Sequence, residues 1–135
     1  MSKNKRFEIN NKLKIYKMND YEWYVTPWNI TDTLKWYNEE FEDNITEEDI
    51  IESNIDTEGM WWETEDKNDI ERLEDYDEII SIEKTSEGTK RKICFGNLMR
   101  KEGEIYKYIP FREVIKNYYS NNPLKEPEVI ATTEW

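Results

Sequence analysis

The chain has 135 residues, a length typical of one domain, so we expect residues 1–135 to form a single domain. It has 31 acidic and 19 basic residues, no histidine and one cysteine, and its formal charge is −12. This composition excludes histidine-dependent catalytic triads, histidine metal ligands and an internal disulfide. The negative charge also argues against direct binding to nucleic acid or to an anionic membrane.

The N-terminal residues are polar, and we expect residues 1–11 to form a disordered tail. They lack the apolar stretch of a secretory signal. No other segment approaches the roughly 20 apolar residues that a membrane span needs. We therefore expect a cytoplasmic protein that does not bind membranes.

Aromatic residues make up 14% of the chain and indicate that it folds, although 37% of its residues are charged. Disordered chains are poor in aromatic and β-branched residues, which supply the apolar surface that a core needs. Sixteen isoleucines add to that surface. The composition therefore predicts a folded domain with a highly charged surface.

Negative charge is concentrated in residues 39–78, which we call the acidic segment. It contains 19 acidic residues but only two basic ones, Lys67 and Arg72. Its net charge is −17, whereas the rest of the chain carries +5. Apolar residues punctuate the segment and predict that it is anchored to a core with its carboxylates facing water. Two interpretations stay open, a solvated acidic surface and an acidic binding face.

The first third of the chain predicts a hairpin followed by helices. Residues 13–18 and 21–26 alternate apolar and polar side chains around a short polar turn, as strands of a hairpin do. Apolar residues at helical spacing predict a helix over residues 31–43, with Thr31 as its N-cap. Acidic residues after Thr46, which can act as an N-cap, predict a second helix over residues 46–53.

The middle of the chain predicts a turn, a short strand and a short helix. Residues 56–59 contain turn formers and a glycine, and residues 60–63 follow as a strand. Alternation along that strand places Trp61 and Trp62 on opposite faces, so we expect the outward ring to be exposed. Asn68, with a glutamate three residues later, fits a capping box and predicts a helix start.

The last third predicts two further hairpins, a helix and a final strand. Turn formers and alternating apolar residues give these limits: strands at 78–84 and 91–95, strands at 98–100 and 104–109, a helix after Pro110, and a strand at 129–132. The chain thus predicts an α+β fold, a mainly antiparallel sheet built from hairpins with two or three helices packed on it.

Two chemical patterns fall within the acidic segment. Trp61 and Trp62 are surrounded by carboxylates, a combination that suits binding of a lysine or arginine from a partner. Glu65-Asp66-Lys67, with Asp56 upstream, resembles the acidic motif of metal-dependent nucleases. That motif belongs on a strand, whereas this stretch is predicted to be a loop before a helix. We therefore predict no catalytic residue, metal site or cofactor.

Exposed carboxylates in a row can imitate the phosphates of nucleic acid, and the partner predicted for them is a basic, nucleic-acid-binding host protein. The predicted partner-binding residues share an acidic or indole side chain within the acidic segment: Glu47, Glu48, Asp49, Glu52, Asp56, Glu58, Trp61, Trp62, Glu63, Glu65 and Asp66. Three alternatives stay open: an immunity-type protein, a small carboxylate- or metal-dependent nuclease or hydrolase, and a structural protein whose acidity serves solubility. The sequence does not predict an oligomeric state.

The chain also resembles a class of small acidic proteins. Its size, its acidity and its asparagine-, isoleucine- and lysine-rich composition are similar to those of phage and mobile-element proteins from low-GC bacteria, including anti-CRISPR and other anti-defence inhibitors. The stretches that carry the resemblance are residues 96–100, 106–108, 111–114 and 131–135. The resemblance implies a non-enzymatic inhibitor that acts inside a bacterial host cell, and it assigns no residue a role.

Overall fold

The computed structural model describes residues 13–133, and the tail predicted at residues 1–11 lies outside them. This part of the chain contains three α-helices and ten strands, and all the strand pairs are antiparallel. The predicted α+β class is therefore confirmed. The longest described helix has 12 residues, and none of the described helices has both the length and the apolar character that crossing a membrane requires.

The chain divides into two compact units. Unit 1 comprises Met1–Ile55 and Ile115–Trp135, and unit 2 comprises Asp56–Val114. Each unit has a four-stranded sheet with its own strand order. The expectation of a single domain, which rests on chain length, stays a prediction.

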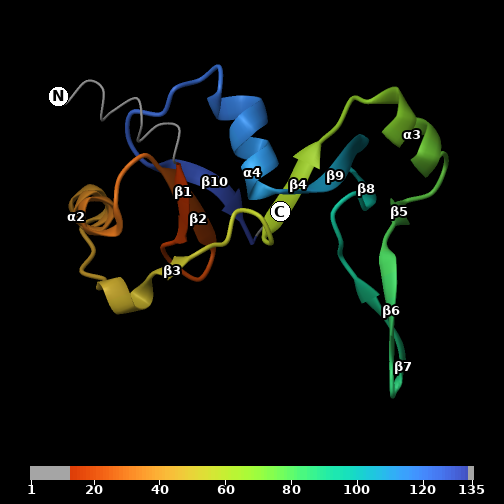
Figure 1. Cartoon of the computed structure of the whole chain (residues 1–135), viewed down its shortest axis with the longest axis horizontal. Coiled ribbons are helices and arrows are strands. Elements are labelled where there is room, and N and C mark those ends of the chain that lie inside the picture. Colours follow the sequence, from red (N-terminus) through yellow and green to blue (C-terminus); the bar gives the residue numbers. More distant parts are fainter. Residues whose placement is uncertain (1–12, 134–135) are drawn as a thin grey trace. The chain divides into compact units, whose positions relative to one another are not determined.

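Unit 1 is built on a sheet with the strand order β10-β2-β1-β3 (Figure 1). β1 (Lys14–Lys17) and β2 (Glu22–Thr26) form the first predicted hairpin, and β10 (Glu128–Thr132) is the predicted final strand. In the hairpin turn, the Asn19 side chain accepts a 2.8 Å hydrogen bond from the Tyr21 backbone N–H. An Asx turn of this kind stabilises the connection without the glycine that many hairpins use.

The predicted first helix is present as α2 (Ile30–Phe41), but its N-cap prediction was wrong. Asn29 caps the helix instead of Thr31, because its side-chain oxygen accepts a 2.8 Å hydrogen bond from the Asp32 backbone N–H. Both residue types are good N-caps, so residue type alone did not separate them. The helix ends where Glu42 adopts a left-handed backbone with φ of 51°.

The core of unit 1 is rich in tyrosine. Its buried cluster consists of Tyr16, Met18, Tyr24, Tyr37 and Ile50, which come from the hairpin, from α2 and from the residue before β3. The rings of Tyr24 and Tyr37 meet edge-on with centroids 5.6 Å apart. Such pairs contribute about 0.5–1.5 kcal/mol beyond the burial of their area. Part of the aromatic content that predicted a folded chain is therefore in this core.

The second helix predicted in unit 1, over residues 46–53, was wrong. Only Glu47–Asp49 form a helical turn, η1, and the chain then enters β3 (Ile51–Glu52). Ile50 is buried in the core, and Ile51 pairs with β1. Ile50 gains burial in the core and Ile51 gains a backbone partner in the sheet, and tertiary contacts of this kind override a weak local helix preference.

Unit 2 is built on a sheet with the order β4-β9-β8-β5. Its strands are β4 (Gly59–Glu63), β5 (Glu78–Ile79), β8 (Leu98–Lys101) and β9 (Glu104–Pro110), so the predicted strand at residues 60–63 and the predicted hairpin of β8 and β9 are confirmed. β6 (Ser81–Thr85) and β7 (Gly88–Lys92) form a separate two-stranded ribbon, seen beyond β5 in Figure 1. The returning strand lies three residues earlier than predicted.

One buried cluster of unit 2 is aliphatic. α3 (Lys67–Leu73) contributes Leu73, which is fully buried with Leu98 and Ile105, and Ile79 packs against them. After β9, the chain forms α4 (Phe111–Val114), as predicted after Pro110, and continues as a π-helical turn, η2 (Ile115–Tyr119). Each unit therefore buries its own cluster, with different side-chain chemistry.

Gly59 is needed where β4 passes β9. A Cβ at this position would lie 2.1 Å from the backbone oxygen of Ile109 and 2.8 Å from the Phe95 ring. The first contact is with backbone, which cannot rotate away as a side chain can. This glycine was predicted as part of a turn, but it begins the strand that carries Trp61 and Trp62.

Candidate functional site

The acidic segment is shared between the two units. Residues 39–55 belong to unit 1 and residues 56–78 to unit 2. The predicted partner-binding residues divide accordingly, with Glu47, Glu48, Asp49 and Glu52 in unit 1, and Asp56, Glu58, Trp61, Trp62, Glu63, Glu65 and Asp66 in unit 2. Each unit thus carries its own part of the predicted site.

The four acidic residues in unit 1 lie on η1 and β3, and all are exposed. Within the described residues, no lysine or arginine lies within 4.0 Å of their carboxylates. Asp49 has a local role, because its carboxylate accepts hydrogen bonds from the Thr46 backbone N–H at 2.8 Å and from the Thr46 hydroxyl at 3.3 Å. Thr46 is thus the N-cap predicted from the sequence, although of a much shorter helix.

Glu52 has an electrostatic effect on the core of unit 1. It pairs in register with Tyr16 of β1. Burial raises the pKa of the Tyr16 hydroxyl, and the negative charge of Glu52 raises this pKa further. A carboxylate at this position therefore disfavours a second negative charge beside it.

In unit 2, Trp61 and Trp62 lie on opposite faces of β4, as the alternation predicts. Both rings are half-buried, whereas one was expected to be exposed. Trp61 meets Tyr108 edge-on, with ring centroids 5.3 Å apart, and Trp62 stands opposite Lys107 in register. Pairing with β9, which the sequence did not predict for this strand, places Tyr108 against the Trp61 ring and Lys107 opposite Trp62.

Two predicted site residues in unit 2 are engaged in local structure. Asp56 binds the Arg112 guanidinium through both carboxylate oxygens, one of them at 3.1 Å, and this hydrogen-bonded pair lowers the pKa of Asp56. Asp66 is the N-cap of α3, accepting a 2.7 Å bond from the Asn68 backbone N–H. The capping box predicted at Asn68 was therefore wrong, since this residue lies inside the helix.

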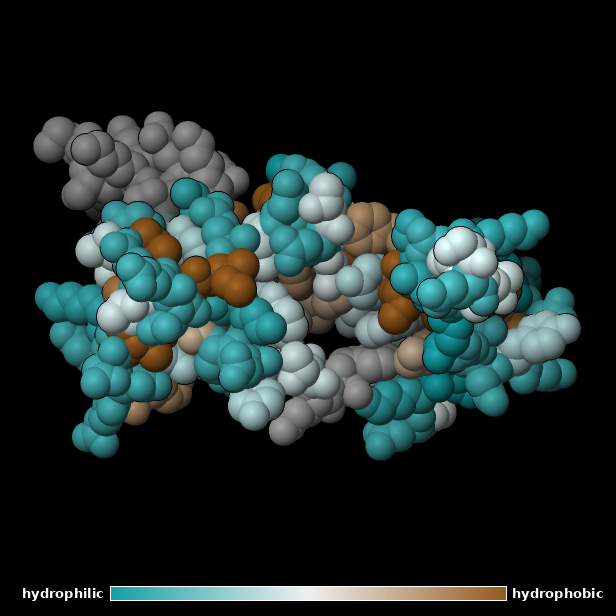
Figure 2. Space-filling model, turned by 90° about the horizontal axis from the view of Figure 1, so that it is seen from below, coloured by the Kyte–Doolittle hydropathy of each residue, from teal (hydrophilic) through white to brown (hydrophobic). Residues whose placement is uncertain are grey.

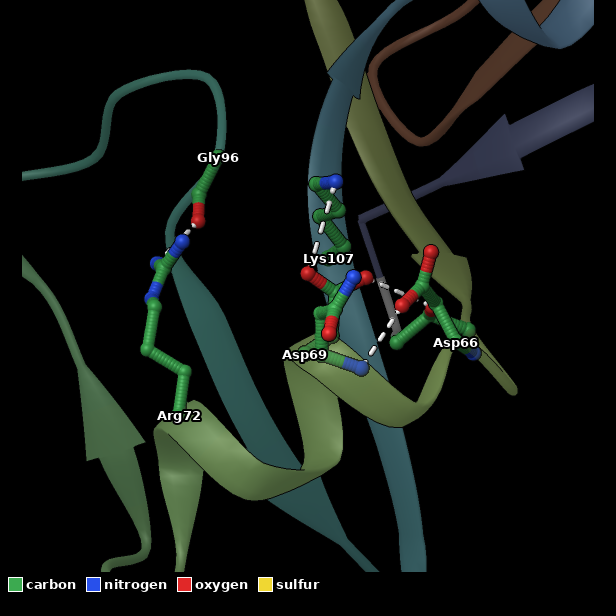
Figure 3. Close-up of polar contacts among 7 residues, drawn as sticks. Asp66, Asp69, Arg72, Gly96 and Lys107 are labelled. Carbon is green, nitrogen blue, oxygen red and sulfur yellow. Dashed lines mark hydrogen bonds and ion pairs between the residues drawn. The ribbon is translucent and has the colours of Figure 1, made fainter.

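Asp69, which the sequence analysis did not single out, is the most buried carboxylate of α3. It accepts a 2.8 Å hydrogen bond from the Thr64 hydroxyl and lies 3.5 Å from the Lys107 ammonium (Figure 3). Further along α3, Arg72 donates a 2.6 Å hydrogen bond to the Gly96 carbonyl. These hydrogen bonds and this ion pair connect α3 to neighbouring elements of unit 2.

The remaining predicted carboxylates of unit 2, Glu58, Glu63 and Glu65, are exposed. For Glu63 and Glu65, as for the group in unit 1, no basic side chain of residues 13–133 lies within 4.0 Å. On the face drawn in Figure 2, hydrophilic residues predominate and hydrophobic residues lie among them in small separate groups.

One site was missed by sequence reasoning. A groove of about 370 Å³ in unit 1 is lined by Trp28, Asp32, Lys35, Trp36 and Glu39. Trp36 was expected in the core because most tryptophans are buried, but it is half-buried. The sequence did contain a signal for the groove. Asp32, four residues before Trp36, and Glu39, three residues after it, are charged and share its helix face.

The nuclease-like stretch lies as predicted on a loop and helix start, with Asp66 as a cap and Lys67 as the first residue of α3. Across residues 13–133, no three or more histidine, cysteine, aspartate or glutamate side chains are grouped so that they would hold a metal ion.

The chain was compared with protein-family models, with curated proteins and with solved structures, and none of the three comparisons found a match.

Proposed function

We propose that this protein is a non-enzymatic inhibitor that binds the basic nucleic-acid cleft of a host enzyme through exposed carboxylates. The observation that carries the proposal is the group Glu47, Glu48 and Glu52 in unit 1. These side chains are exposed, and no described basic residue neutralises them. They leave negative charge available to a partner.

The physical basis is imitation of a phosphate row. Double-stranded DNA carries one negative charge per roughly 1.7 Å of its axis, and proteins bind it with lysine and arginine. Carboxylates displayed on a folded surface attract the same basic side chains. Long-range attraction would accelerate association with such a cleft, and the rate would fall as salt screens the charges. A neutral or acidic partner would not be attracted to this surface.

The resemblance to small phage and mobile-element proteins supplies the biological setting. In this proposal, the target belongs to a bacterial defence system, as for anti-CRISPR proteins, and inhibition takes place in the cytoplasm of the host cell. The protein itself does not bind nucleic acid, because its charge of −12 opposes the approach of phosphates. It competes with nucleic acid for the enzyme.

The test is affinity capture from a nuclease-treated lysate of a low-GC bacterium, at low and high salt, with mass spectrometry to identify partners. The matched variant reverses the charge of Glu47, Glu48, Asp49 and Glu52 to lysine. We expect one basic, nucleic-acid-binding partner that high salt or added DNA or RNA removes and that the variant does not capture. Circular dichroism of the variant controls for folding.

Two results would contradict the proposal. Retention of the partner by the folded charge-reversed variant would exclude the carboxylates of unit 1 as the binding surface. A specific partner that is indifferent to nucleic acid would instead indicate an immunity-type or allosteric inhibitor.

A further inference from the structure

The groove beside α2 combines two indole rings with charged side chains on one helix face. Asp32 lies three and four residues before Lys35 and Trp36, and Glu39 lies four and three residues after them, so the four residues share one face of α2. Trp28, from the loop between β2 and α2, completes the lining. Both indoles are half-buried, so part of each remains accessible from the groove.

The loop that carries Trp28 is held in place from two sides. The Trp28 backbone N–H donates a 3.0 Å hydrogen bond to the Thr26 hydroxyl. That hydroxyl is also 2.9 Å from the hydroxyl of Thr33 on α2, and both threonines are fully buried. The loop is thereby fixed to the strand before it and to the helix after it.

Trp36 is held by neighbouring rings. It meets Tyr24 at a centroid distance of 6.0 Å and Phe41 at 5.9 Å, both edge-on. Tyr24 is part of the buried core of unit 1. Because this ring is already held in place, a ligand that binds in the groove loses little free energy to ordering it. This favours binding of even a small ligand.

The charges around the groove favour a cation. Asp32 and Glu39 contribute two negative charges, and Lys35 contributes one positive charge. Within residues 13–133, Lys35 forms no ion pair within 4.0 Å, and the Lys17 ammonium lies over the Trp23 ring, outside the groove, at 4.9 Å from its centroid. No described cation of the chain itself therefore lies over the indoles of the groove.

We propose that this groove binds the guanidinium group of an arginine side chain from a protein partner. Guanidinium is planar and weakly hydrated, stacks on aromatic faces and pairs with carboxylates, so it matches both components of the lining. The inference deepens the proposed function and rests on it for the source of the arginine, a basic nucleic-acid-binding protein. The chemistry of the groove itself can be tested without that partner.

The direct test is a titration of the isotope-labelled protein with Nα-acetyl-arginine amide, followed through the indole N–H signals of its six tryptophans. Nα-acetyl-citrulline amide is the matched probe, because it has nearly the same shape without the charge. We expect saturable shifts of the Trp28 and Trp36 signals with the arginine compound, with a Kd in the millimolar range, and none with citrulline.

Charge variants sharpen the test and do not disturb ring packing. Asp32→Asn and Glu39→Gln should each weaken arginine binding about two- to fivefold, whereas Lys35→Gln should strengthen it by a similar factor. Glu48→Gln removes the same charge from unit 1 outside the groove, so it should change the affinity less than either groove variant. Trp28→Leu should abolish the saturable shift of Trp36.

The inference is overturned if citrulline shifts the same signals, if arginine gives no saturable shift, or if Glu48→Gln weakens binding as much as Asp32→Asn does. These outcomes are separable from failure of the proposed function. Capture of a partner that depends on the carboxylates of η1 and β3, without any arginine response at Trp28 and Trp36, would leave the proposed function standing and remove the groove from it. An arginine response without a captured partner would leave the inference about the groove standing and would count against the proposed function.

Discussion

The two parts of the acidic segment use their carboxylates differently. In unit 2, Asp56 pairs with Arg112, Asp66 caps α3, and Asp69 is held by Thr64 and Lys107. In unit 1, the glutamates of η1 and β3 have no described basic residue within 4.0 Å. Carboxylates of one continuous acidic stretch therefore serve two purposes: Asp56, Asp66 and Asp69 stabilise unit 2, whereas the glutamates of η1 and β3 are exposed, as are Glu63 and Glu65 of unit 2.

This difference shows why net charge is a poor guide to a binding site. A charge of −17 over residues 39–78 counts every carboxylate alike. A carboxylate that already accepts hydrogen bonds from its own chain has less to offer a partner, and its loss weakens the fold. An exposed carboxylate without such contacts contributes little to stability, and clustered like charges even oppose it.

The largest expected effect on stability is that of removing Asp69. Asp69→Ala deletes the acceptor for Thr64 and leaves the Lys107 ammonium without its partner. Since hydrogen bonds to charged groups contribute about 1.5–3 kcal/mol, we expect the free energy of unfolding to fall by about that amount. Urea unfolding followed by circular dichroism measures it.

Glu48→Ala is the matched control, because it removes one carboxylate of the same segment from unit 1. We expect the free energy of unfolding to change by less than about 0.5 kcal/mol, as for most surface substitutions. Equal effects of Asp69→Ala and Glu48→Ala would remove the distinction between the two parts of the segment.

A smaller loss is expected from removing the cap of α3. Asp66→Ala leaves the Asn68 N–H without its side-chain acceptor, and loss of an N-cap costs about 1 kcal/mol. Asp66→Asn should retain most of the stability, because asparagine caps about as well as aspartate. If both substitutions destabilise equally, the charge of Asp66 matters rather than its hydrogen bond.

The ion pair of Asp56 and Arg112 should make the stability of the fold depend on pH. The pair lowers the pKa of Asp56, so its contribution to stability is present above the ordinary carboxyl range and is lost as pH falls through the lowered pKa. Both side chains are well exposed, and we expect a small effect. Carboxyl NMR titration should show the Asp56 pKa returning toward its ordinary value in Arg112→Gln. An unchanged pKa would mean that the pair does not persist in solution.

The smallest expected effect is that of Glu52 on Tyr16. Burial is the main cause that raises the Tyr16 pKa, and Glu52 adds to it, so Glu52→Gln should lower this pKa slightly while leaving it above 10. Tyrosinate absorbance against pH, with Tyr16→Phe to identify the group, measures the shift. Because the folded pKa is raised, the stabilisation is complete below pH 10 and is lost as pH rises through the folded value. Glu47→Gln should change the Tyr16 pKa less, because the charge of Glu47 is not among the causes that raise this pKa.

The hairpins were predictable from the sequence, whereas the pairings between strands far apart in the chain and the roles of single carboxylates were not. Alternation and turn residues predicted the hairpins of β1 with β2 and of β8 with β9, because period-two patterns are local signals. The end of the short helix at η1 depends on Ile51 pairing with β1, a contact between residues far apart in sequence. Local propensity carries no information about such a contact.

For the candidate site, the sequence predicted the acidic composition but not which carboxylates have partners. Exposure of the glutamates in unit 1 agrees with the expected solvated carboxylates. Engagement of Asp56 and Asp69 depends on Arg112 and Lys107, which lie about 40 or more residues away in the sequence. The groove was missed because Trp28 precedes α2 and joins this helix face only through the hydrogen bonds of Thr26.

The most direct test of this account is the affinity of the captured partner for Glu47→Gln/Glu48→Gln/Glu52→Gln, measured at low salt beside Asp69→Asn. Removing three exposed charges should weaken binding by about tenfold or more while stability stays equal or rises, since each such pair contributes up to about 1 kcal/mol. Asp69→Asn should do the opposite, lowering the unfolding temperature while binding well below that temperature stays unchanged. An affinity of the triple variant within twofold of the wild-type value would contradict the claim that the exposed glutamates of unit 1 form the binding surface.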